Sequence, residues 1–154
     1  MKQSLLIIAA ALAVPALVAA EEPTKNAYVP GLGEFMMATQ LRHAKLWFAG
    51  EAKNWDLARY EIDEIEEGLD DAAEFDPTHD GIPVADMLKA NMGAPLAALI
   101  KAADGKDSVS FSAAFDKLTA GCNACHAGAR HGFIVIQRPT TLPVSNQAFG
   151  TDGK

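Results

Sequence analysis

Two cysteines and a histidine carry the most chemistry in this sequence: Cys122, Cys125 and His126, in the run CNACH of a chain with no other cysteine. Two thiols about one helical turn apart can each add to a vinyl group of one porphyrin, and the adjacent imidazole can then reach the iron. The same cysteine spacing occurs in redox-active disulfides and in zinc sites. The motif therefore allows three chemistries, and the surrounding sequence must discriminate among them.

The disulfide and zinc interpretations each lack a feature that they need. A redox-active pair usually lies at the N-terminus of a helix that follows a strand, where the helix dipole lowers the thiol pKa, whereas this pair lies near the end of a predicted helix. A zinc site needs about four ligands, and the chain has only four histidines and no second metal-type pair. A chance match is the remaining alternative. Covalent attachment of one haem is the prediction that fits best.

The N-terminal 20 residues are typical of a secretory signal peptide. Lys2 is followed by an apolar run over residues 5–20, which ends in small residues before Glu21. Pro15 interrupts the run, which is also shorter than the roughly 20 residues that span a bilayer, so a membrane anchor is disfavoured. We therefore expect cleavage after Ala20 and a soluble, exported, periplasmic protein.

The chain is acidic, with 13 basic and 20 acidic residues and a formal charge of −7, which becomes −8 when Lys2 is removed. Such a surface repels nucleic acid and anionic membranes, and it would suit a basic redox partner. Acidic composition also keeps exported proteins soluble, which is the simpler account. Both accounts apply to the predicted second helix, whose acidic residues are Asp63, Glu64, Glu66, Glu67, Asp70, Asp71 and Glu74.

Helical periodicity dominates the sequence after the leader, and no alternating pattern is long enough to indicate a sheet. Apolar and turn residues predict four helices, at residues 32–48, 55–75, 83–103 and from about 111 into the CNACH motif. Gly50 is expected to close the first helix, and Gly93 and Pro95 to kink or break the third. Ser108 or Ser110 is expected to cap the fourth.

Four helices with short connections predict an all-α, up-down-up-down four-helix bundle in a single domain. The bundle should occupy residues 32–128. An irregular leader at residues 21–31 should precede it, and an extended tail at residues 129–154 should follow it.

The phase of the fourth helix predicts that both thiols point inward. Its inward positions Phe111, Phe115 and Leu118 continue, at steps of four and three, to Cys122 and Cys125. The histidine that follows lies at the edge of the same face. A haem would then fill one end of the bundle as an apolar core element.

The chain resembles the class II cytochromes c, the family that contains cytochrome c′ and its low-spin relatives. The resemblance rests on CNACH near the C-terminal end and on the four-helix pattern before it, over roughly residues 32–128. Class I cytochromes instead attach haem near the N-terminus and use a downstream methionine, and here no methionine follows His126. The tail after His126 is longer than the family usually carries.

The resemblance implies one of two functions, which differ in the ligand that faces His126. A methionine there implies low-spin iron and one-electron transfer between periplasmic redox proteins. A vacant position implies a five-coordinate protein that binds or scavenges gases. Class II relatives are often dimers, so a homodimer is also implied.

Met36 and Met37 are the candidates for this sixth ligand. In an up-down bundle the first helix begins where the fourth ends, so its first turns lie opposite the haem. Low-spin class II cytochromes take their methionine from this region, although either residue could instead be core filler. His43 is a weaker candidate. Met36 is slightly favoured, because it belongs to an inward stripe of Leu32, Met36, Thr39, His43 and Leu46.

The remaining candidates are less specific. His79 and His131 are expected at the surface, while Arg42, Arg130 and Arg138 could pair with haem propionates or be ordinary surface arginines. The sequence contains no paired carboxylates in a recognisable site, no nucleophile with a base and no phosphate-binding glycine loop. We therefore do not predict an enzyme.

Overall fold

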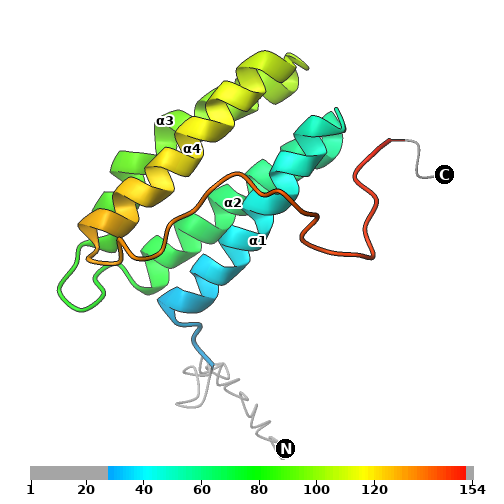
Figure 1. Cartoon of the computed structure of the whole chain (residues 1–154). Helices are drawn as coiled ribbons and strands as arrows, with labels where there is room; N and C mark the ends of the chain where they lie inside the picture. Colours follow the sequence, from blue (N-terminus) through cyan, green and yellow to red (C-terminus); the bar gives the residue numbers. More distant parts are fainter. Residues whose placement is uncertain (1–27, 152–154) are drawn as a thin grey trace, which may run out of the picture.

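The computed structural model describes residues 28–151, which form an all-α, up-down-up-down four-helix bundle with an extended C-terminal tail (Figure 1). The helices are α1 (Leu32–Glu51), α2 (Trp55–Phe75), α3 (Val84–Asp104) and α4 (Ser108–Gly128). The predicted fold class is confirmed. The expected signal peptide lies outside the described residues. None of the helices at residues 28–151 is long and apolar enough to cross a membrane.

Two helix boundaries differ by about one turn from those predicted, and both ends of α3 differ by one residue. Gly50 does not close α1, which continues to Glu51; the chain turns at Lys53, whose φ is 55° and whose N–H donates to the Gly50 carbonyl. The cap of α4 is Asp107, because its carboxylate accepts hydrogen bonds from the backbone N–H groups of Val109 and Ser110. That arrangement starts α4 about one turn earlier than predicted.

Pro95 does not break α3, which continues through it to Asp104. A proline removes the hydrogen bond to the carbonyl four residues earlier, here that of Asn91. This carbonyl faces Gly121 of α4, where an added Cβ would lie 2.7 Å from the oxygen. The carbonyl without its helical hydrogen bond therefore lies where α3 and α4 pack closely. We attribute the continuity of α3 at Pro95 to this packing.

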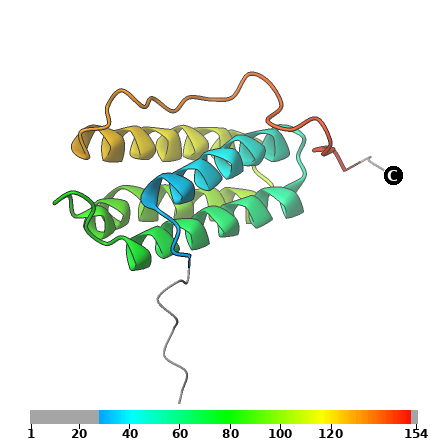
Figure 2. The same ribbon diagram turned by 90° about the horizontal axis from the view of Figure 1, so that it is seen from below.

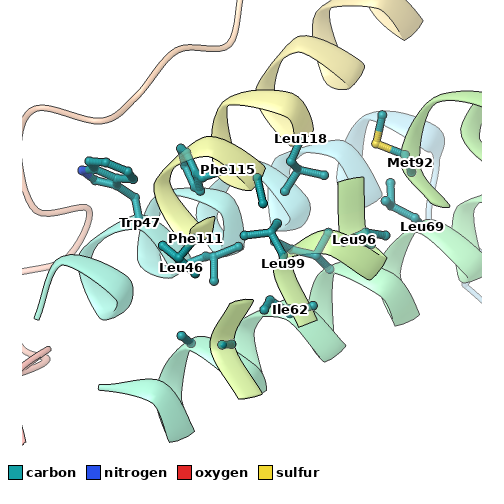
Figure 3. Packing of buried hydrophobic residues seen from close by; sticks show 14 of the residues in the cluster. Leu46, Trp47, Ile62, Leu69, Met92, Leu96, Leu99, Phe111, Phe115 and Leu118 are labelled. Carbon is teal, nitrogen blue, oxygen red and sulfur yellow. The ribbon is translucent and has the colours of Figure 1, made fainter. Parts of the chain in front are cut away.

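Apolar side chains from all four helices form one core along the bundle (Figure 3). From α2, Ile62, Ile65 and Leu69 are buried in this core. Trp47, Phe111 and Phe115 pack their rings together toward one end of the core, with Trp47 and Phe115 centroids 4.9 Å apart. Met92 and Leu69 lie toward the other end, as Figure 3 shows. The large rings thus leave smaller and more flexible side chains at the end where α4 finishes.

α1 approaches α4 closely at Gly50. Replacing this glycine by alanine tests how tightly the two helices pack there. A Cβ at Gly50 would lie 2.0 Å from Cε1 of Phe111, which is itself buried. We expect Gly50→Ala to destabilise the protein by roughly 1–3 kcal/mol, because the ring must move within a packed core. Gly93→Ala is the matched control: nothing lies within 4 Å of its added Cβ, so a gain of about 0.5–1 kcal/mol is expected. Urea denaturation measures both; equal effects would contradict the prediction.

The C-terminal tail returns along α4 and crosses to the far end of α1 (Figures 1 and 2). Arg138 makes a two-pronged ion pair with Asp116 of α4, with both N···O distances 2.7 Å, and its guanidinium lies over the Trp47 ring of α1. Phe149 is only 7 % exposed and packs against Phe48. Because α1 and α4 contact each other least among the neighbouring helix pairs, the tail covers the seam between them.

Candidate cofactor site

An apolar cavity lies at the end of the bundle where α1 begins and α4 ends. It has an inner part of about 50 Å³ and an outer part of about 400 Å³. Its size is in the range of small-molecule and cofactor sites. The two parts share the lining residues Met36, Gln40, Leu88, Cys125, His126 and Ile136, so they adjoin each other.

Both cysteines point toward this cavity, which confirms the predicted phase of α4. Cys122 and Cys125 are partly buried, pack against the core and line the inner part. They are free thiols and not a disulfide. Burial raises the pKa of Cys122 to about 11 and also raises that of Cys125. At neutral pH both groups are therefore protonated, the opposite of the thiolate character that a redox-active pair needs.

Gly121 allows α4 to bring Cys122 beside α3. A Cβ at this position would lie 2.7 Å from the Asn91 carbonyl oxygen and 2.8 Å from Cε of Met92. No side chain larger than hydrogen fits between the two helices without a shift. The glycine before the motif thus positions the first cysteine against Met92 in the same cavity wall.

The backbone holds one ring nitrogen of His126. Its Nδ1 lies 3.0 Å from the backbone carbonyl oxygen of Ile134. A carbonyl only accepts hydrogen bonds, so Nδ1 must carry the proton and donate it. A histidine that donates from Nδ1 to a carbonyl has the orientation found in histidines that bind metals through Nε2. The ring lines both parts of the cavity.

The two candidate methionines occupy different positions. Met36 is partly buried and lines both parts of the cavity, whereas Met37 is 69 % exposed and lines only the outer part. Met36 therefore lies on the same cavity as both thiols and His126, as the inward stripe predicted. Met37 borders Cys125 and His126 from a position open to solvent.

Two further methionines line the cavity and were not identified as site residues from the sequence. Met92 belongs to the inner part and Met87 to the outer part, both from α3. Every methionine of the chain except Met1 thus borders the cavity. The concentration of methionine in one half of the bundle was the signal available, but the rotation of α3 was needed to interpret it.

His43 is a buried histidine with a hydrogen-bond partner. It is 4 % exposed, and its Nε2 lies 2.8 Å from Oγ1 of Thr119. Because that hydroxyl donates its proton to the Phe115 carbonyl, it accepts from Nε2–H of the histidine. Burial lowers the pKa of His43 to about 4, so the ring is neutral at pH 7. It lines the inner part of the cavity with Nε2 already occupied.

The other two histidines border the outer part of the cavity. Nδ1 of His79 lies 2.6 Å from a carboxylate oxygen of Asp76, and the ring of His131 packs against Phe133. The sequence placed both residues at the surface, and His131 is indeed exposed. The structure adds that they flank the opening near His126.

None of the three arginines proposed as propionate partners lines the cavity. Arg138 is paired with Asp116, and Arg42 lies 3.3 Å from Glu61 and 2.6 Å from Glu64. Arg130, which is exposed, has a positive φ of 62° just after α4. Two of the three guanidinium groups are thus held by carboxylates of this chain.

Arg42 instead compensates a fully buried carboxylate, and its removal should give a pH-dependent loss of stability. Burial raises the pKa of Glu61, while Arg42 opposes that rise. Because the folded-state pKa is above the unfolded one, stability falls as pH rises through it; without Arg42 the fall becomes larger. Arg42→Ala should cost about 2–3 kcal/mol at pH 8 and clearly less at pH 5.

Urea denaturation at the two pH values measures this difference. Arg59→Ala is the control, because Arg59 lies within ion-pair distance of the exposed carboxylates Asp63 and Asp104. It should cost about 0–1 kcal/mol, with little dependence on pH. An Arg42→Ala cost that is the same at both pH values would show that Glu61 is not the group that Arg42 compensates.

No family model matches the chain, and searches of curated proteins and of solved structures find no match. Within residues 28–151, no three His, Cys, Asp or Glu side chains gather as ligands of a metal ion would.

Proposed function

We propose that this chain is an exported c-type cytochrome, similar to the class II cytochromes c, that carries one covalent haem and transfers single electrons between periplasmic proteins. The observation that carries the proposal is the convergence of Cys122, Cys125, His126 and Met36 on one apolar cavity. Two thiols, an imidazole and a thioether are the groups that covalent attachment and two axial positions require.

The residues present fit a haem. Both sulfurs are free and face the cavity, His126 is held through Nδ1 with its ring on the same cavity, and the cavity walls are apolar. Cys122 and Cys125 would hold the porphyrin as thioethers, and His126 and Met36 would supply its iron with a nitrogen and a sulfur ligand. When bound, the haem supplies a metal centre that gains and loses one electron.

The surrounding side chains have two roles in this proposal. Leu69, Leu88 and Met92 make the lining of the inner part of the cavity apolar, and a low dielectric would favour the less charged, reduced state. The outer part opens beside the exposed Met37 and Ile134, which offers a partner an apolar surface near the site. The acidic composition would favour a basic partner, and a homodimer belongs to the same proposal.

Haem staining after denaturing electrophoresis and visible spectra of the purified protein test the proposal. A covalent stain, sharp reduced bands, a weak far-red sulfur-to-iron band in the oxidised form and no response to carbon monoxide would support methionine ligation and electron transfer. A high-spin spectrum that shifts with carbon monoxide would instead support a five-coordinate, gas-binding protein. The absence of a covalent stain would overturn both.

A further inference from the structure

The polar contacts between the end of α4 and the tail form a continuous path to His126. Arg130 takes a left-handed conformation, and the backbone N–H groups of Arg130 and His131 donate to the carbonyls of Ala127 and His126. This is the Schellman arrangement, which reverses the chain at a helix end. A further turn, closed by the Ile134 N–H and the His131 carbonyl, brings Ile134 back over α4. The reversal delivers the Ile134 carbonyl to Nδ1 of His126.

A single side chain fixes the tail just beyond this point. Nδ2 of Asn123 donates to the Ile136 carbonyl at 2.9 Å, and Oδ1 accepts from the Ile136 N–H at 2.8 Å. An asparagine amide matches both polar groups of one residue, as a neighbouring strand would. Asn123 lies between the two cysteines of CNACH, so the motif that provides the sulfurs also anchors the tail.

We propose that Asn123 is a positioning residue for His126: by holding Ile136, it keeps the Ile134 carbonyl on Nδ1 of the imidazole. This inference rests on the proposed function, since its consequence is the strength of His126 as an iron ligand. A histidine that donates its second N–H to a carbonyl is a stronger electron donor to a metal. Loss of such a partner typically lowers metal affinity or activity by about 10–100-fold. The hydrogen bond therefore stabilises the oxidised state.

The other tail anchors do not provide this effect. Arg138 and Asp116 meet two residues beyond Ile136, and Phe149 lies much farther along the tail. These contacts hold the tail to the bundle but touch neither Ile134 nor His126. Asn123, in contrast, holds Ile136, which is two residues from the Ile134 carbonyl that accepts from His126.

The reduction potential of the holoprotein tests the inference, with Asn123→Ala as the variant and Asp116→Asn as the matched control. Asn123→Ala should raise the equilibrium constant for reduction about tenfold, which is about 59 mV for one electron. Asp116→Asn loosens the tail at Arg138 and should change this constant by less than about twofold. Circular dichroism checks that both variants remain folded. An unchanged potential for Asn123→Ala, or an equal shift for Asp116→Asn, would overturn the assignment.

A second readout distinguishes failure of this inference from failure of the proposed function. If the purified full-length chain carries no haem, the tautomer of His126 is measured by correlating ring protons with ring nitrogens in NMR. The proton should lie on Nδ1 in the wild-type protein and redistribute toward Nε2 in Asn123→Ala. A ring protonated on Nε2 in the wild type, or a tautomer unaffected by the substitution, would overturn the positioning role.

Discussion

Replacing Cys122 and Cys125 together by alanine is expected to abolish covalent haem attachment completely. Both thiols border the inner part of the cavity, and the described chain has no other cysteine that could form a thioether. The measurement is haem staining of the chain after denaturing electrophoresis, compared at equal protein load. Each single variant keeps one sulfur and should retain a weaker stain.

Ala124→Ser is the control for this experiment, because Ala124 lies between the two cysteines and is exposed. It should stain as strongly as the wild type. A stain that survives in the double variant would place the attachment elsewhere. A wild-type chain that does not stain would leave a partly buried pair of free thiols without a role in haem binding.

Replacing Met36 by alanine is expected to convert the protein from a six-coordinate to a five-coordinate haem protein. Met36 lines both parts of the cavity, and its truncation would remove the proposed sixth ligand of the iron. The reduced protein should then bind carbon monoxide, and the oxidised spectrum should change from low-spin to high-spin. Absorption spectra with and without the gas measure both changes.

Met37→Ala is the matched control, because it removes the neighbouring sulfur from a side chain that is 69 % exposed. It should leave the spectrum and the lack of gas binding unchanged. The reverse result, with Met37→Ala alone becoming high-spin, would identify Met37 as the ligand. If both variants stay low-spin, Met92 becomes the next residue to replace, since it also lines the inner part.

Local sequence signals predicted most of the bundle. The bounds of α2 were predicted to the residue, because Asn54 caps its start and Asp76 and Pro77 end it. The inward phase of Cys122 and Cys125 was also predictable, since it continues the spacing of Phe111 and Phe115. These features depend only on residues a few positions apart.

The features that sequence analysis missed depend on contacts between distant segments. α3 continues through Pro95, and the carbonyl of Asn91 that the proline leaves free lies where Gly121 of α4 approaches closely. Met92 faces the cavity only because α3 takes one particular rotation against α4. The hydrogen bond between His126 and Ile134 requires the chain to reverse after α4. None of these has a periodic pattern that a sequence could display.

The tail that covers the α1–α4 seam has a consequence for folding kinetics. The most extensive helix contacts are α1 with α2 and α3 with α4, pairs that are adjacent in sequence and can form early as helical hairpins. The hydrogen bond from Asn54 to Phe149 joins residues 95 positions apart, so its loop-closure entropy is among the largest in the chain. The seam between the first and last helices should therefore be the last part of the bundle to close.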